Sequence, residues 1–337
     1  MIVDCAHYQD GRRLHDGPVP LAEVAARCTQ GGFVWLGLHE PDEGELAQVR
    51  DAFGLHDLEI EDALKIHRRP KLEEYDHGVR LLVLRTARYD DAAEEVDFGE
   101  ISVLFAPSFV ITVRQGVANE LRGVRQALEQ RPELLAEGSA SVLWAVLNTV
   151  VAGYAPVVHE VGYDIDQIEA TVFAGASAPT ERIYSLRQEA THFYRAVHPL
   201  IAVIASVEHA VGKKVRHYLR AVQDSLLLVD EEVATQRDLL STCLEANMAV
   251  LSVEQTRVSL QQNATMEQLT ILATVFLPLT FVTGFFGQNF SWLVGHIAGG
   301  GPFIIWGIGG LLLPLVLLFG WLRFRAPSGR LRRRSRT

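Results

Sequence analysis

The sequence predicts an α+β membrane protein, in which a large soluble part is followed by a long helix that continues into the first of two transmembrane helices. Three patterns lead to this prediction. Residues 268–322 contain no Asp, Glu, Lys or Arg, although 21% of the chain is charged. Residues 213–277 contain neither Gly nor Pro. Strand-like segments occur only before residue 139, where long helical patterns begin.

The N-terminal region, residues 1–138, has a mixed α/β pattern and is expected to form a cytoplasmic domain. Amphipathic spacing predicts two helices, at 43–53 and 57–66, with turn-forming residues at their ends. Short segments rich in β-branched and apolar residues predict strands at 2–8, 33–38, 79–88, 100–105 and 109–114.

Residues 139–266 are expected to form a cytoplasmic helical region and a stalk. The 65 residues of 213–277 would form one helix about 100 Å long. A stripe of apolar residues follows this helix at steps of three, four or seven, at Leu226, Val229, Val233, Leu240, Leu244, Leu251 and Val258. Such a stripe needs partners along its length. The partners are either other helices of this chain or copies of the stalk itself.

The uncharged window predicts two membrane spans, at 267–287 and 302–322. Each holds an apolar run near the roughly 20 residues that a crossing helix needs. A single apolar run of this kind could also be a buried core helix. That interpretation is less suitable here, because a second run follows the first after a Gly-rich connection, residues 288–301.

The last fifteen residues indicate the orientation. The tail 323–337 holds seven Arg and no acid, which places it in the cytoplasm by the positive-inside rule. Two crossings return the chain to its starting side, so the N-terminus is expected there too, in a multi-pass protein of the cell (inner) membrane. Anionic lipid explains the Arg run without a nucleic-acid partner.

The soluble part is strongly acidic. Without the seven tail Arg, 24 of the 31 Lys and Arg remain against all 41 Asp and Glu, so residues 1–322 carry a formal charge of −17. Such a field attracts cations. The three cysteines have no metal-ligand spacing and suit a reducing compartment.

One face of the first predicted span carries small and polar residues at helical spacing. Tight helix packing explains such a face as readily as a pore lining does. The residues recur in steps of three or four, at Asn263, Met266, Thr270, Ala273, Leu277, Thr280, Gly284 and Gly287. The second span is more uniformly apolar, as expected of a helix that faces lipid.

The segment 268–290, QLTILATVFLPLTFVTGFFGQNF, resembles the signature of the CorA superfamily of divalent cation transporters, in which the first span ends in Gly-x-Asn, usually Gly-Met-Asn. Further similarity lies at 67–73, 164–169, 183–199 and 218–224. The resemblance implies a homopentamer with a cytoplasmic α/β funnel, long stalk helices and a central pore lined by the first span. It also implies passive uptake of Mg²⁺ and of Co²⁺ or Ni²⁺.

By the same resemblance, Gly287, Gln288 and Asn289 correspond to the selectivity ring at the outer mouth of the pore. The wall of the pore then corresponds to Leu269, Ala273, Leu277, Thr280 and Gly284, and its cytoplasmic end to Asn263 and Met266. Mg²⁺ loses water reluctantly, so neutral oxygens from Asn289 and the Gly287 carbonyl suit a hydrated ion. A helix C-terminus with Gly and Asn in favoured positions is the plainer interpretation of the same residues.

The sequence also departs from the family pattern. Gln288 replaces the usual Met and the outer loop has no carboxylate, while Gly299 begins a Gly run similar to that of the ZntB branch, which is associated with Zn²⁺. In the motif that resembles the family's regulatory Mg²⁺ site, Ala221 stands at the Asp position. Asp90, Asp91 and Asp224 are the candidate substitutes, although surface carboxylates are usually just solvated.

The function expected from the sequence is a passive Mg²⁺ channel that needs no cofactor, the divalent cation being its substrate and a possible regulator. A ZntB-like Zn²⁺ transporter and a non-conducting membrane-anchored sensor are the alternatives. No phosphate-binding Gly loop or nucleophile motif suggests an enzyme.

Overall fold

The computed structural model describes residues 1–15, 17–117, 121–176, 178–288, 291–310, 312–313, 316–317 and 319–320. The chain divides into two compact units, Met1–Leu251 and Ser252–Thr337. The α/β region and the helices that follow it therefore belong to one unit, and the first of those long helices begins at Ser139.

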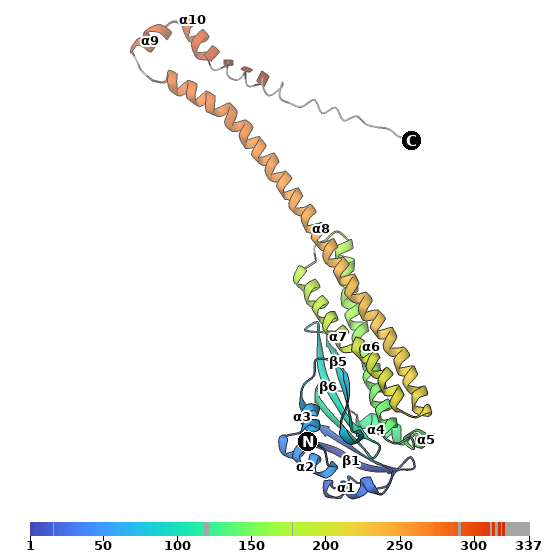
Figure 1. Ribbon diagram of the computed structural model, residues 1–337. Coiled ribbons are helices and arrows are strands. Elements are labelled where there is room, and N and C mark those ends of the chain that lie inside the picture. The colour runs from blue at the N-terminus through green and yellow to red at the C-terminus, as the bar shows by residue number, and fades with distance from the viewer. Residues whose placement is uncertain are drawn as a thin grey trace, which may run out of the picture. The chain divides into compact units, whose positions relative to one another are not determined.

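A mixed seven-stranded sheet in the order β2-β1-β3-β7-β6-β5-β4 forms the centre of the first unit (Figure 1). The parallel pair is β3 with β7, and the other neighbours are antiparallel. The strands are β1 (Ile2–Gln9), β2 (Arg12–Arg13), β3 (Phe33–His39), β4 (Lys71–Glu74), β5 (Arg80–Asp90), β6 (Glu95–Ala106) and β7 (Phe109–Gly116). All five predicted strands are present, and β2 and β4 were not predicted.

Both faces of the sheet are buried, because alternate strand residues join two different apolar clusters. Phe33 and Trp35 enter one cluster, while their neighbours Val34 and Leu36 enter the other. Three short helices contribute to the second cluster: α1 (Leu21–Thr29), α2 (Glu43–Phe53) and α3 (Asp57–Leu64). The chain between β4 and β5 forms a short 3₁₀ turn, η1 (Asp76–Gly78).

Local signals explain where α2 begins and ends. Its N-cap Asp42 accepts a hydrogen bond from the Glu45 backbone N–H, and the Glu45 carboxylate accepts one from the Asp42 N–H. Gly54 then takes a left-handed conformation with φ 66°, a conformation that glycine adopts without steric cost. The predicted helix 43–53 is confirmed at both ends.

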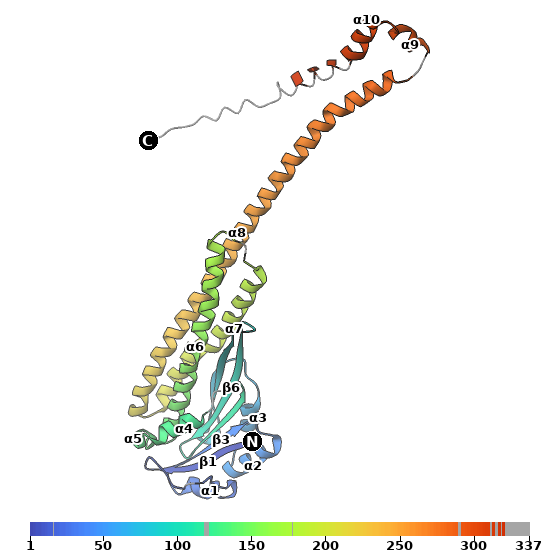
Figure 2. The same ribbon diagram turned by 180° about the vertical axis from the view of Figure 1, so that it is seen from behind.

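The helices on the other face form a bundle with the sheet. They are α4 (Arg122–Glu129), α5 (Pro132–Leu135), α6 (Ser139–Phe173), α7 (Thr180–Ala210) and the first part of α8 (Lys213–Phe286). Figures 1 and 2, seen from opposite sides, both show α6 and α7 beside this part of α8. Leu226, Val229, Val233 and Leu240 are buried in the same cluster as α6 and α7.

For the first part of the apolar stripe on α8, this packing corrects the interpretation that its partners are copies of the stalk. Its first four residues pack against helices of their own chain, so they are not a surface for copies of the stalk. Farther along, Leu251 is half-buried and Val258 is 48% exposed. The two interpretations thus apply to different parts of one helix, and the exposed part of the stripe has no partner among the described residues.

The second unit contains the end of α8, α9 (Ser291–Ile297), α10 (Gly300–Pro302) and the π-helical segment η2 (Phe303–Ile308). Among the described residues, two helices are long and apolar enough to cross a membrane. In α6, 61% of the most apolar 18-residue segment is buried, as in a core helix. In α8, 0% of the corresponding segment is buried. The predicted second span, 302–322, lies partly outside the described residues, and the tail 323–337 lies wholly outside them.

Candidate functional site

The pore residues expected from the sequence share one side of α8. Successive residues of an α-helix are rotated by about 100°, so these positions fall within an arc of about 120°. We call this set the neutral face; it consists of Asn263, Met266, Leu269, Ala273, Leu277, Thr280, Gly284 and Gly287. No charged side chain lies in α8 beyond Glu267, so the helix is uncharged around its whole circumference from residue 268 to its end.

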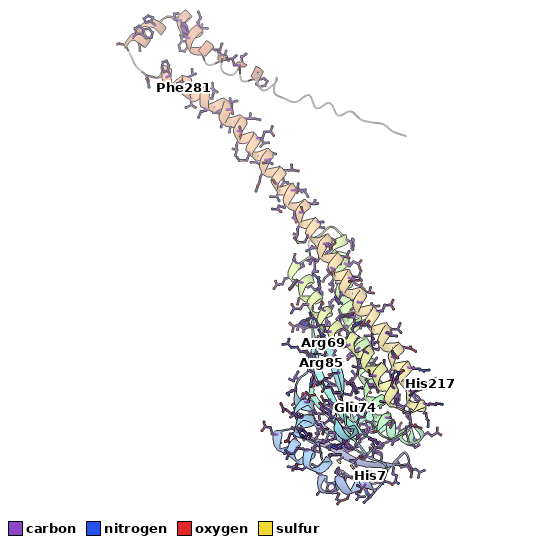
Figure 3. The ribbon with its side chains drawn as sticks, in the orientation of Figure 1. His7, Arg69, Glu74, Arg85, His217 and Phe281 are labelled. Carbon is purple, nitrogen blue, oxygen red and sulfur yellow. The ribbon has the colours of Figure 1, made fainter. Side chains whose placement is uncertain are left out.

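Within the part of the chain that the structure describes, no other element covers the neutral face. Met266 is 62% exposed, Leu269 55% and Leu277 76%. Phe281, labelled in Figure 3, is likewise exposed and projects from this end of the helix. A stretch of α8 that carries this much exposed apolar surface is not stable in water as a single chain, and it requires lipid, a second copy, or both.

Threonine hydroxyls on α8 bond back to the helix itself. Thr280 Oγ1 donates to the carbonyl oxygen of Phe276 over 2.8 Å, and Thr270 Oγ1 donates to that of Met266 over 2.7 Å. Each hydroxyl proton is therefore used, while the oxygen keeps lone pairs that can accept. Toward anything that lies beside the neutral face, Thr280 presents a neutral acceptor.

The end of α8 presents further neutral oxygens. Gly287 N donates to the carbonyl oxygen of Thr283 over 2.9 Å, and Gln288 N donates to that of Phe285 over 3.3 Å. The last carbonyls of a helix lack an intrahelical donor and carry the negative end of the helix dipole. Cations are therefore favoured at this end. Asn289, the remaining residue of the predicted ring, lies outside the described residues.

The two glycines of the neutral face have open surroundings apart from the backbone of α8 itself. A Cβ added to Gly284 would meet no atom within 4 Å outside the adjoining turns of its own helix. A Cβ added to Gly287 would lie 3.1 Å from the carbonyl oxygen of Thr283, which belongs to the last turn of the same helix. Within the described residues, no other element of the chain requires a small side chain at either position.

The predicted regulatory carboxylates are exposed and lie on two separate elements. Asp90 ends β5, where its Oδ1 accepts hydrogen bonds from the backbone N–H groups of Ala92 (2.9 Å) and Ala93 (3.3 Å). Asp91 is in the adjoining turn, and Asp224 is on α8. Within the described part of the chain, no group of three His, Cys, Asp or Glu side chains could hold a metal ion. A site built from these carboxylates therefore stays a prediction that needs a second copy.

The sequence resemblance at 164–169 corresponds to a structural contact that was not predicted. The Asp164 carboxylate accepts hydrogen bonds from Tyr89 on β5 and from Arg182 Nη2 on α7, the latter over 3.1 Å. Arg182 Nε also donates to Glu94, 2.8 Å away in the turn after Asp91. Burial and the Asp164 carboxylate raise the pKa of Tyr89. Partners 75 residues apart leave no local signal in a sequence.

Comparison with known families gives a match over almost the whole chain. The family model described as CorA-like Mg²⁺ transporter protein matches residues 30–325. Two similar curated proteins are YfjQ of Bacillus subtilis, whose name assigns it provisionally to metal ion transport, and the cobalt/magnesium transport protein CorA of Thermotoga maritima. Each is 27% identical; YfjQ covers 77% of this chain and 80% of its own length, and CorA covers 76% and 72%.

Solved structures show a similar fold. The complete CorA magnesium transporter of Methanocaldococcus jannaschii superposes with a TM-score of 0.64 at 16% identity, over 98% of this chain and 99% of that chain. The ZntB cytoplasmic domain of Vibrio parahaemolyticus superposes with a TM-score of 0.53 at 11% identity, over 77% and 98%. At these identities the likeness concerns the fold alone.

Proposed function

Because this chain belongs to the CorA-like Mg²⁺ transporter family, we propose that it carries divalent cations, and Mg²⁺ in particular, through a pore that several copies of α8 form around a common axis. The observation that carries this proposal is the neutral face of α8, which is uncharged beyond Glu267 and exposed throughout. One helix cannot enclose a pathway, so the face acquires a transport role through assembly.

The chemistry of the neutral face suits a hydrated ion. Mg²⁺ holds its water shell strongly, and a carboxylate ring would bind it too tightly for rapid passage. Thr280 and the carbonyls at the end of α8 offer neutral acceptors that bond to the water shell. The −17 formal charge of residues 1–322 attracts cations toward the first unit, which holds most of the acidic side chains.

We place five copies around the pore, following the family resemblance, with Gly287, Gln288 and Asn289 at its outer mouth. Both termini lie in the cytoplasm of a cell whose inner membrane holds the protein, because the Arg-rich tail favours that side. The exposed Asp90, Asp91 and Asp224 would then meet a neighbouring copy, where a divalent cation can relieve their repulsion and regulate the pore.

Flux measurement on purified full-length protein in liposomes tests the proposal. With a Mg²⁺-sensitive dye inside and an inside-negative potential, we expect Mg²⁺ uptake that a cobalt hexammine complex blocks, because this complex mimics the hydrated ion. The same vesicles, offered Zn²⁺ with and without a proton gradient, test the ZntB-like alternative. Proton-dependent Zn²⁺ uptake without Mg²⁺ uptake would mean that Zn²⁺, and not Mg²⁺, is the substrate. Uptake of neither ion would refute the proposal that the protein transports divalent cations.

A further inference from the structure

A groove lies between α6 and α8 in the first unit, and we call it the α6–α8 groove. It has a volume of about 360 Å³, within the range of small-molecule sites. Apolar side chains form much of its wall, and its polar side chains are those of His159, Tyr163, Asp166, Glu232 and Gln236. All of its lining residues come from these two helices, which Figures 1 and 2 show side by side. The relative position of the two helices therefore decides which polar groups meet.

α6 and α8 run parallel where they pack together. Trp144 and Tyr218 contact each other with ring centroids 5.2 Å apart. Farther along, Gly162 lies beside Gln236, because a Cβ added to Gly162 would lie 3.1 Å from Gln236 Nε2. In both pairs the residue on α8 comes 74 positions after the residue on α6 (218 − 144 and 236 − 162). This constant offset means that the two helices run in the same direction and stay in register.

The two carboxylates of the groove are too far apart to share one metal ion. Asp166 lies four residues beyond Gly162 on α6, and Glu232 lies four residues before Gln236 on α8. Because the helices are parallel, the two acids lie on opposite sides of the contact between Gly162 and Gln236, about 12 Å apart along the helix axis. A divalent cation holds its oxygen ligands at about 2.0–2.6 Å, so no single ion bridges both acids. The spacing suits an extended cation that carries several charges.

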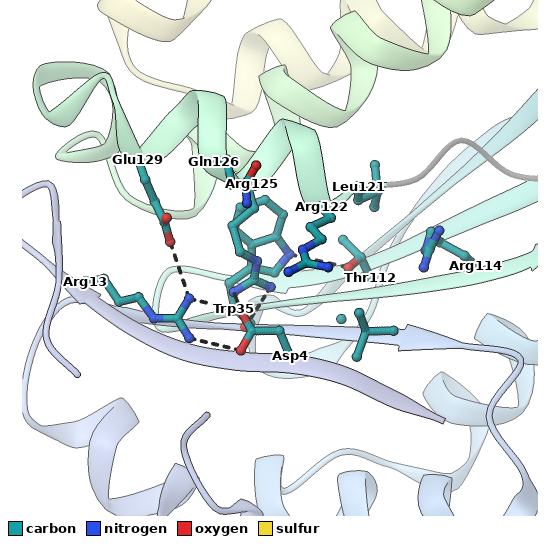
Figure 4. A pocket seen from close by; sticks show the side chains of 12 residues that line it. Asp4, Arg13, Trp35, Thr112, Arg114, Leu121, Arg122, Arg125, Gln126 and Glu129 are labelled. Atoms are coloured by element: carbon teal, nitrogen blue, oxygen red, sulfur yellow. Dashed lines mark hydrogen bonds and ion pairs between the residues drawn. The ribbon is translucent and has the colours of Figure 1, made fainter. Parts of the chain in front are cut away.

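Both carboxylates lack a compensating cation. Among the described residues, no Lys or Arg lines the groove, and neither Asp166 nor Glu232 has an ion-pair partner. The cavity between the sheet and α4 is different, because its acids are already paired (Figure 4). There Arg13 donates to both carboxylate oxygens of Asp4, over 3.1 and 3.0 Å, and lies 3.6 Å from Glu129. The α6–α8 groove thus has two unpaired negative charges that a ligand can neutralise.

Gln236 adds a hydrogen-bond acceptor between the two acids. Its side chain lines the groove, and the residue is only 2% exposed. Gln236 Nε2 donates to the carbonyl oxygen of Val158 over 2.8 Å, which fixes the orientation of the amide. Gln236 Oε1 is buried and has no hydrogen-bond partner in the described part of the chain. A buried acceptor without a donor is unfavourable, so this oxygen favours a ligand that carries an N–H group.

We propose that the α6–α8 groove binds a linear polyamine, with its terminal ammonium groups at Asp166 and Glu232 and an inner amine at Gln236. The terminal nitrogens of an extended triamine such as spermidine are about 11 Å apart, which is close to the spacing of the two acids. Charged amines form strong hydrogen bonds with carboxylates. Tyr163 and Leu239, which are 62% and 37% exposed, offer apolar surface to the methylene groups between the amines. This site is in the first unit and does not depend on whether α8 forms a pore.

Isothermal titration calorimetry on the full-length protein in detergent, without divalent cations, tests the proposal. At pH 8 a histidine side chain is ordinarily neutral, so His159 adds no charge to the groove. The probes are spermidine and diaminooctane, a diamine of the same length in which a methylene group replaces the inner amine. We expect spermidine to bind saturably and more tightly than diaminooctane, because only spermidine has a donor for Gln236 Oε1.

Substitutions of the acids separate this site from general attraction to an acidic protein. Asp166→Asn and Glu232→Gln should each weaken spermidine binding on the order of tenfold, through loss of a charged hydrogen bond. Both residues are exposed, so the melting temperature without ligand should not change. Glu231→Gln is the matched control, since Glu231 is exposed beside Glu232 but does not line the groove, and it should bind as the wild type does.

Three results would overturn the proposal. The first is that spermidine does not bind saturably, and the second is that diaminooctane binds as tightly as spermidine. The third is that Glu232→Gln and Glu231→Gln have equal affinity for spermidine, whether both match the wild type or both are weaker. In that case the binding would not depend on the groove.

Discussion

Tyr89 on β5 and Asp164 on α6 are joined by a hydrogen bond between the phenol hydroxyl and the carboxylate, which fastens the edge of the sheet to the helical bundle. Arg182 on α7 donates to the same carboxylate, whose side chain is 12% exposed. We expect Asp164→Asn to lower the free energy of unfolding by about 2–3 kcal/mol, because it removes charge-assisted hydrogen bonds from a buried site.

Thermal unfolding of the full-length protein in detergent checks this prediction, with an expected fall in melting temperature of about 5 °C or more. Asp166→Asn is the matched control. Asp166 lies two residues further along α6 and is exposed, so its change should be close to zero. Equal melting temperatures for the two variants would show that the Asp164 contacts do not stabilise the unit.

Thr280 tests the role of neutral acceptors on the neutral face. Thr280→Val keeps the shape of the side chain but removes the oxygen, so we expect the Mg²⁺ flux into liposomes to fall roughly 2- to 10-fold, the equivalent of one net hydrogen bond. Thr283→Val is the control, since Thr283 also bonds back to a helix carbonyl, that of Leu279 at 2.9 Å, but lies outside the neutral face. The hypothesis fails if both variants conduct alike.

Substitution of Gly284 tests whether the assembled protein needs open space beside this position of the neutral face. Because a Cβ there would meet no atom within 4 Å outside its own helix, Gly284→Leu should leave the free energy of unfolding unchanged or raise it by up to about 1 kcal/mol, through the higher helix propensity of Leu. In an assembly around a pore, the added side chains would narrow the pathway and lower the flux by about an order of magnitude.

The matched control for Gly284→Leu is Gly123→Leu on α4, another helical glycine with open space around its Cβ position. It should change neither the flux nor the apparent size of the protein in detergent. A Gly284→Leu protein that conducts like the wild type would place Gly284 away from the ion pathway.

The strands and helices that could be predicted are those with a local signal. The segment 33–38 alternates between two apolar faces and became β3 with one residue added. The end of α2 at Gly54 follows from the left-handed conformation that glycine favours. By contrast, β4 has the sequence KLEE, in which no apolar alternation marks a strand, and pairing with β5 determines its conformation.

What could not be predicted depends on partners distant in the sequence. The apolar stripe of α8 showed that partners exist without showing whether they belong to the same chain. The intramolecular core that includes α6 and α7 supplies them up to Leu244. The cavity between the sheet and α4 draws Arg13, Arg114 and Arg122 from three separate elements, so no spacing in the sequence indicates it. The neutral face could be predicted because all its residues lie on one helix. There the spacing of residues in the sequence gives their angular positions around the helix axis.

Cys5 gives the first unit a defined response to alkaline pH. The thiol is 1% exposed on β1, and burial raises its pKa from 9.0 to about 12. In the unfolded chain the thiol loses its proton near pH 9, whereas in the folded chain it keeps the proton until about pH 12. Its contribution to stability is therefore complete below pH 9 and is lost as the pH rises from 9 toward 12.

Urea unfolding of the full-length protein between pH 7 and pH 10.5 measures this loss. At pH 10.5 we expect the wild type to have lost about 2 kcal/mol through this thiol, at up to about 1.4 kcal/mol per pH unit. Cys5→Ala removes the titrating group, so it should be less stable than the wild type at pH 7, through loss of buried volume, but should lose less stability with pH. The remaining slope belongs to buried tyrosines such as Tyr154, whose pKa burial also raises. Identical slopes for the two proteins would mean that the Cys5 thiol ionises in the folded state, which requires that water reach β1.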